Sequence, residues 1–113
     1  MGFGRRRRRR GDGPATMDRG AASVDRAHLE EFVRTRTGVE GFIEPRTTVT
    51  ETTLLLVSLQ GEWTRRRVPT AQWAHQWANK LGVPTYDAAV VGYPQRMRDW
   101  NRRQKQAGEQ AGA

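Results

Sequence analysis

The sequence contains no cysteine. This absence excludes disulfide bonds, thiolate zinc sites, iron–sulfur clusters and cysteine nucleophiles. It also fits a reducing compartment, so we expect a cytoplasmic protein. Long apolar runs are missing as well: the longest, Leu54 to Val57, has the length of a strand, whereas a membrane span needs about 20 residues. We therefore expect no membrane partner.

Histidine and serine are scarce, which removes most of the usual catalytic and metal-binding arrangements. The two histidines, His28 and His75, have no second histidine one helical turn away, so we expect no metal site. Neither Ser23 nor Ser58 has the glycine neighbours of a nucleophile elbow. Glycine-rich phosphate and dinucleotide motifs are absent too. The sequence therefore predicts no cofactor and no catalytic residues, and hence a protein that is not an enzyme.

Three carboxylates keep an enzymatic alternative open. Glu40 and Glu44 lie four residues apart on one predicted strand, so they share a face, and Asp87 precedes another predicted strand. Paired carboxylates can carry out acid–base chemistry, but simpler ion-pair partners are available: Arg46 or Arg65 for Glu44, and an arginine on a helix for Asp87. In the corner Glu44-Pro45-Arg46, two side chains of opposite charge flank a proline that restricts the backbone. Its role stays open between a recognition loop and a hydrogen-bonded connection.

Positive charge dominates the chain, but much of it belongs to one segment. The 113 residues carry 20 Lys and Arg against 12 Asp and Glu, for a net charge of +8. Six of these cations form the block from Arg5 to Arg10, and without the block the net charge is +2. Met17 also suits a translation start; beginning there would remove six Arg and one Asp and leave +3. The position of each cation therefore matters more than their total.

The pattern of apolar residues predicts one α+β domain over residues 23–104, between disordered tails at 1–22 and 105–113. Helical spacing indicates helices from Asp25 to about Thr37, after Thr70 and after Pro94. Strand patterns cover residues 39–44, 47–59 and 63–68, and the apolar run 88–91 is interpreted as a fourth, buried strand. The predicted order is α-β-β-β-α-β-α, with a mixed four-strand sheet covered by helices. A crossover through the second helix would make the third and fourth strands parallel.

Three segments are distinctive: residues 39–50 (VEGFIEPRTTVT), 61–68 (GEWTRRRV) and 91–99 (VGYPQRMRD). Over about residues 38–103 the chain resembles a family of small actinobacterial proteins without established function. The resemblance implies a lineage and a cytoplasmic setting, and it brings no catalytic residues to this chain. Some relatives carry an oxidoreductase label, for which the sequence offers no supporting residues.

Basic residues inside the domain point to an anionic partner. The candidate anion-binding residues are Arg46, Arg65, Arg66, Arg67, Arg98, Arg102 and Lys105. Three of them are consecutive on one predicted strand, directly before a helix start whose free N–H groups also favour phosphate. The last three recur at i, i+4 and i+7 and form a basic stripe on the final helix. Trp63 and Trp100 lie among these cations and are candidates for stacking on bases.

Two interpretations of these cations compete. In the leading one they bind a polyanion, with RNA or the ribosome as the favoured partner, and binding weakens steeply with salt. In the other, the cations are exposed on a strand and on a solvated helix face, or they bind an acidic protein surface. Trp63 and Trp100 then pack on the sheet. The first five elements resemble the order in double-stranded RNA-binding domains, but the characteristic loop residues are missing. A protein-interaction module is the second choice and an enzyme the third; the oligomeric state stays open.

Overall fold

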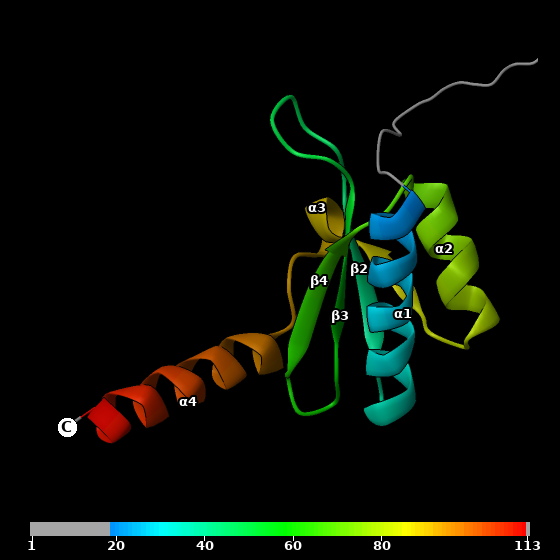
Figure 1. Ribbon diagram of the computed structural model, residues 1–113. Coiled ribbons are helices and arrows are strands. Elements are labelled where there is room, and N and C mark those ends of the chain that lie inside the picture. The colour runs from blue at the N-terminus through cyan, green and yellow to red at the C-terminus, as the bar shows by residue number, and fades with distance from the viewer. Residues whose placement is uncertain (1–18, 113) are drawn as a thin grey trace, which may run out of the picture.

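In the computed structural model, which describes residues 19–112, a four-strand sheet lies between two layers of helices (Figure 1). The elements are α1 (Arg19–Thr35), β2 (Glu40–Glu44), β3 (Thr53–Val57), β4 (Trp63–Arg67), α2 (Ala71–Lys80), β5 (Thr85–Asp87), α3 (Ala88–Val91) and α4 (Gln95–Gly112). This order confirms the predicted α+β domain with a mixed sheet, and it adds the one-turn helix α3. The predicted tail over residues 1–18, with its arginine block, lies outside the described residues.

The strands lie in the order β4-β3-β2-β5. Strands β2, β3 and β4 form an antiparallel meander, and β5 pairs with β2 in parallel. Strands β4 and β5 therefore point the same way, as the predicted crossover requires, and they lie at opposite edges of the sheet. Helix α2 carries the chain across the face of the sheet, past β3 and β2, before β5 begins (Figure 1).

Strand β3 is covered on both faces, as its continuous apolar run predicts. Leu54 and Leu56 pack in a cluster with α1 and α2, whereas Leu55 and Val57 pack in a second cluster that includes residues of α3 and α4. All four side chains are completely buried. The helices α1 and α2 thus cover one face, and α3 with the beginning of α4 covers the other (Figure 1).

The run 88–91 is a helical turn and not the buried strand that its valines predict. The strand β5 lies just before it and ends at Asp87, whose side chain accepts a hydrogen bond from the backbone N–H of Ala89 and so caps α3. Because the chain turns there, Val90 and Val91 are 79% and 55% exposed. A local cap therefore outweighs the strand preference of the two valines.

Both outer helices are longer than the sequence patterns predict. Helix α1 begins at Arg19, inside the expected tail, and α4 continues to Gly112, past the expected end of the domain at residue 104. The second extension follows from composition, because glutamine, lysine, alanine and glutamate favour helix and no proline interrupts them. From residue 101 to 109 every side chain is exposed. The far half of α4 therefore projects from the domain as an arm (Figure 1).

Gly61, in the turn between β3 and β4, determines how closely α4 approaches the sheet. Its φ is +97°, and a Cβ at this position would lie 2.0 Å from the carbonyl oxygen of Arg96. Only glycine combines that backbone conformation with such an approach. Two hydrogen bonds secure the same contact: Trp63 Nε1–H to Asn101 Oδ1 at 2.7 Å, and Arg103 Nη2–H to the carbonyl of Gln60 at 3.1 Å.

Candidate functional site

The three consecutive arginines of β4 lie on alternate faces of the sheet, and all three are paired. Arg65 and Arg67 share the face that carries α4, whereas Arg66 lies on the face that carries α1. Each guanidinium meets a carboxylate: Arg65–Glu44 at 2.7 Å, Arg66–Asp25 at 3.5 Å and Arg67–Glu51 at 3.8 Å. Much of the positive charge of this strand is therefore neutralised within the domain.

Glu44 is the centre of the most extensive of these arrangements. Its carboxylate accepts hydrogen bonds from Arg65, from the hydroxyl of Thr53 at 2.7 Å and from the hydroxyl of Tyr93. Burial alone would raise the pKa of Glu44, but these hydrogen bonds outweigh it, so its pKa lies below the ordinary value. The same contact acts oppositely on the phenol: the hydrogen bond to Glu44, with burial, raises the pKa of Tyr93. The charged side chain of Glu44 thus links β2, β3 and β4 to the segment before α4.

Glu40 lies on the same face as Glu44 but has its own partners. It pairs with Arg96 at the start of α4 and accepts a hydrogen bond from Tyr86 at 3.3 Å. Arg96 also donates from Nε to the carbonyl of Ser58 at 2.9 Å. Glu40 lines two hollows described below, whereas neither Glu44 nor Asp87 lines them. The structure therefore does not bring these three carboxylates together in one hollow.

Arg98, Arg102 and Lys105, here called the α4 row, lie on the side of α4 that faces away from the sheet. The opposite side makes the contacts, through the buried Met97 and the partly buried Trp100. Within the α4 row, Arg102 pairs with Asp99 at 2.7 Å. Arg98 donates to the side-chain oxygen of Gln95 at 3.3 Å. Among the described residues, neither Arg98 nor Lys105 has a carboxylate partner.

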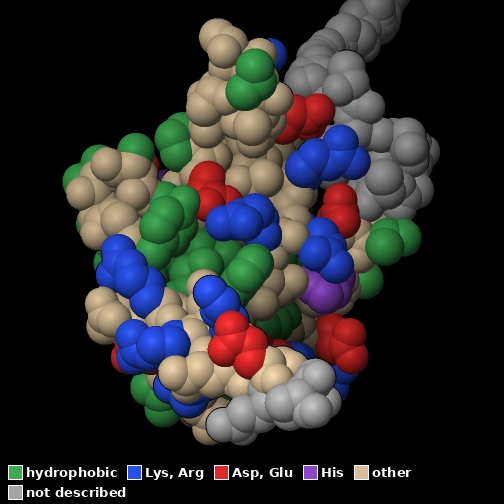
Figure 2. Space-filling view, turned by 90° about the vertical axis from the view of Figure 1, so that its left-hand side faces the viewer, with side chains coloured by type: hydrophobic (Ala, Val, Ile, Leu, Met, Phe, Trp, Pro, Cys, Tyr) green, Lys and Arg blue, Asp and Glu red, His purple; other side chains and the backbone are tan. Residues whose placement is uncertain are grey.

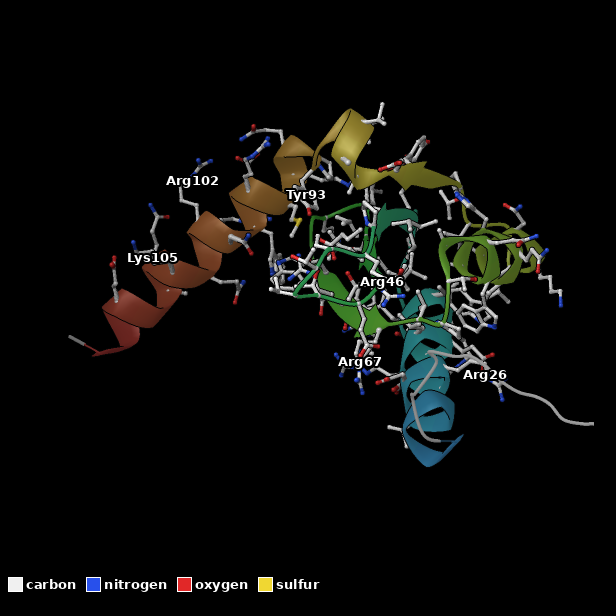
Figure 3. All side chains as sticks on the ribbon, turned by 90° about the horizontal axis from the view of Figure 1, so that it is seen from above. Arg26, Arg46, Arg67, Tyr93, Arg102 and Lys105 are labelled. Atoms are coloured by element: carbon white, nitrogen blue, oxygen red, sulfur yellow. The ribbon has the colours of Figure 1, made fainter. Side chains whose placement is uncertain are left out.

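The strand cations and the α4 row do not form one cluster. Figure 3 shows Arg102 and Lys105 on the projecting helix, well away from Arg46 and Arg67 over the sheet. Arg46 lies in the exposed β2–β3 connection, where Thr47 accepts hydrogen bonds from the backbone N–H groups of Val49 and Thr50. Figure 2 shows the side from which α4 projects, where basic and acidic side chains alternate around a hydrophobic area.

The two candidate stacking residues are already covered by arginines. The guanidinium of Arg65 lies 5.3 Å from the ring centre of Trp63, and that of Arg103 lies 5.8 Å from that of Trp100. The indole N–H of Trp63 is also engaged with Asn101. One face of each ring is therefore occupied by a guanidinium, so a base that stacked on that face would have to displace an arginine.

The larger hollow lies at the end of the sheet where β2 begins, and has a volume of about 540 Å³. Its lining is mainly apolar, including the exposed Leu59 and Leu81, and it also contains the arginines Arg36 and Arg96. Arg36 bonds to Glu62 at 2.6 Å. No sequence pattern points to this hollow, because its lining comes from five separate segments that meet only through the order of the strands in the sheet.

The histidines are engaged in side-chain hydrogen bonds rather than gathered together. His28 bonds to Thr64 at 2.6 Å, and His75 bonds to Thr85 at 2.7 Å. Within residues 19–112, no three acidic or histidine side chains are placed to hold a metal ion. In the same part of the chain, each helix is too short or too polar to cross a bilayer.

No sequence motif pointed to Tyr86 or Tyr93, yet Tyr86 donates a hydrogen bond to Glu40 and Tyr93 donates one to Glu44. The position of Tyr86 beside Phe42 depends on the pairing of β5 with β2, which local sequence patterns do not reveal. No local signal exists for Tyr93 either, since it lies in a connection. Comparison with known proteins adds no assignment: no family model, no curated protein and no solved structure matches the chain.

Proposed function

We propose that this protein is a non-enzymatic cytoplasmic module that binds a polyanion, with RNA as the favoured partner, through the α4 row. The observation that carries the proposal is the α4 row on a projecting helix. Helix α4 contains five cations and two carboxylates, and the α4 row faces away from the domain. A polyanion can approach such a helix without any rearrangement of the fold.

The α4 row is a better candidate than the β4 arginines because fewer of its cations form ion pairs with carboxylates. Arg65 makes two hydrogen bonds to Glu44, so a phosphate would have to compete with a bidentate ion pair already in place. In the α4 row, Arg98 and Lys105 lack a carboxylate partner among the described residues. Each cation that neutralises a phosphate releases counterions, which gives affinity without base-specific contacts. Arg46, exposed in the β2–β3 connection, offers a further contact on a long ligand.

The test uses a chain that begins at Met17, which retains every described element and omits the arginine block. RNA binding is measured as a function of salt for this chain and for the variant with Arg98→Gln, Arg102→Gln and Lys105→Gln. Each lost phosphate contact lowers the slope of log affinity against log salt by roughly 0.7 to 0.9. We therefore expect the slope to fall by about two units in the triple variant.

A matched control removes three exposed cations from α1 and α2, with Arg26→Gln, Arg34→Gln and Lys80→Gln. It lowers the net charge by the same three units, so it should reduce binding far less if the α4 row forms the contact. Equal losses in the two variants would mean that total charge is responsible and would contradict the assignment. A Met17 chain that binds no RNA at low salt would overturn the proposal altogether.

A second candidate function is a protein-interaction module, and the 540 Å³ hollow favours it. Apolar side chains that stay exposed around a hollow are typical of surfaces that bind partners. Here Leu59 and Leu81 are 63% and 44% exposed at its edge. The substitution Leu81→Glu distinguishes the two functions: it should abolish capture of a protein partner and leave salt-dependent RNA binding unchanged.

A further inference from the structure

A second, smaller hollow lies between β2, β5 and the segment that joins α3 to α4. Its volume is about 230 Å³. We call it the aromatic hollow, and its lining residues are Glu40, Phe42, Tyr86, Val91, Gly92, Tyr93 and Pro94. Three of these seven residues are aromatic and one is charged. This composition differs from that of the larger hollow, which is mainly aliphatic and contains arginines.

The aromatic rings form the floor and part of the rim of this hollow. Phe42 is only 5% exposed and lies beneath Tyr86, with 5.5 Å between the ring centres and 32° between the planes. Tyr86 and Tyr93 are 36% and 37% exposed. Aromatic ring faces carry partial negative charge, so they attract a cation placed over them. Figure 2 shows hydrophobic side chains gathered on this side of the molecule.

Glu40 contributes a carboxylate to the aromatic hollow, and Arg96 balances part of its charge. Its Oε1 atom pairs with Arg96, which also donates to the carbonyl of Ser58, whereas its Oε2 atom has the longer 3.3 Å bond from Tyr86. The side chain of Glu40 is 31% exposed. Oε2 is therefore the oxygen best placed to receive a further partner while the ion pair with Arg96 stays intact.

We propose that the aromatic hollow binds an alkylammonium group, either the head of a lysine side chain of a partner or a free quaternary amine. Electron-rich rings and a carboxylate both favour a cation, and the apolar lining favours one that carries methyl or methylene groups. An anion would meet the ring faces and Glu40 unfavourably. The proposal does not depend on RNA binding, because the α4 row lies on another part of the surface (Figure 3).

The experiment titrates the full chain with choline, trimethyllysine and lysine, and follows tyrosine and backbone NMR signals. The neutral probe 3,3-dimethylbutanol has the shape of choline without its charge. We expect the cations to shift signals of Tyr86, Tyr93 and Gly92, and the neutral probe to bind about threefold to tenfold more weakly. Equal binding of the neutral probe, or no binding of any cation at millimolar concentration, would overturn the proposal.

Two variants of Tyr93 separate recognition from structure. Tyr93→Phe keeps the ring but loses the hydroxyl contact with Glu44, so cation affinity should stay within about twofold. Tyr93→Leu loses the ring and should weaken binding about threefold to tenfold. If both variants weaken binding equally, the tyrosine acts only through Glu44 and the proposal fails. Tyr86→Leu repeats the test at a residue that does not contact Glu44, with the NMR spectrum as a check of folding.

A lysine-containing peptide distinguishes the source of the ammonium group. If a peptide with an internal trimethyllysine binds more tightly than free trimethyllysine, the hollow takes a side chain from a protein partner. If the two bind equally, the head group alone is recognised and a free amine is the ligand. Both results support an ammonium site. Peptide binding that is unchanged when the trimethyllysine is replaced by norleucine would contradict it.

Discussion

Arg65 donates a hydrogen bond to each carboxylate oxygen of Glu44: Nε–H to Oε1 at 2.7 Å and Nη2–H to Oε2 at 3.0 Å. These bonds join β4 to β2 across the intervening β3, whose Thr53 donates to the same carboxylate. Because the charged form of Glu44 is stabilised in the folded protein, its folded-state pKa lies below the ordinary value of 4.5. Protonation of this carboxylate is therefore coupled to unfolding.

The first prediction concerns acid stability. The contribution of Glu44 is fully present above its unfolded pKa, near 4.5, and is lost as the pH falls through the lower, folded-state pKa. The free energy of unfolding should therefore fall with pH below about 5, and Glu44→Gln should flatten that decline. Urea denaturation at a series of pH values provides the measurement. An acid decline of the same steepness in Glu44→Gln would contradict the prediction.

A control for the same experiment is Glu51→Gln. Its ion pair with Arg67 is long, at 3.8 Å, and both side chains are about half exposed. Exposed pairs of this kind contribute less than about 1 kcal/mol. The control variant should therefore keep nearly the stability of the original chain at neutral pH, whereas Glu44→Gln should be measurably less stable.

The second prediction concerns the approach of α4 to Gly61. Gly61→Ala should lower the free energy of unfolding by about 2–5 kcal/mol, since it adds backbone strain and forces a methyl group against Arg96. Gly82→Ala is the matched control: φ there is also positive, at +73°, but no atom would lie within 4 Å of the new Cβ. That variant should cost only about 1–2 kcal/mol. Equal losses would show that α4 does not constrain the turn.

The third prediction concerns the face of the sheet that carries α4. Leu55 is completely buried there, so Leu55→Ala should cost about 2–5 kcal/mol. Leu59→Ala removes the same atoms from a residue that is 63% exposed, and it should change the stability by less than about 0.5 kcal/mol. Denaturant unfolding of both variants gives the comparison. A small loss at Leu55 would mean that α3 and α4 do not close this face.

The fourth prediction concerns the start of α2. The hydroxyl of Thr70 accepts a hydrogen bond from the backbone N–H of Trp73 at 3.0 Å. Thr70→Ala removes this cap and should lower the melting temperature, corresponding to a loss of about 1 kcal/mol. Thr70→Ser keeps the hydroxyl and should be close to neutral. If serine and alanine destabilise equally, the cap contributes little and methyl packing is responsible.

Sequence patterns predicted the elements that depend on local signals. Thr70 and Gly82 bound α2 as expected, and the apolar run of β3 is buried on both faces. The pairing of β5 with β2 was not predictable in this way, because it brings together segments about 40 residues apart. The prediction of a strand over residues 88–91 was wrong for the opposite reason. The cap formed by Asp87 acts over two residues, and hydrophobicity alone does not reveal it.

The candidate site was predicted in part. Arg46 and Arg65 were both candidate ion-pair partners of Glu44 in the sequence, and the structure pairs Glu44 with Arg65. Asp87 was expected to pair with an arginine on a helix, but it caps α3 instead. The separation of the α4 row from the strand arginines could not be derived from spacing. It depends on which side of α4 packs, and that is determined by contacts such as Gly61 against Arg96.

The arrangement of arginines on β4 has a consequence for self-association. Strand β4 forms one edge of the sheet, and an open edge is a template for pairing with another copy of the chain. A second copy added antiparallel along Trp63–Arg67 would place like-charged guanidinium groups opposite each other, which is unfavourable. The other edge, β5, has only three residues, too short to hold an added strand firmly. Growth of the sheet into aggregates is therefore disfavoured at both edges, so the β4 arginines protect the chain even where no ligand contacts them.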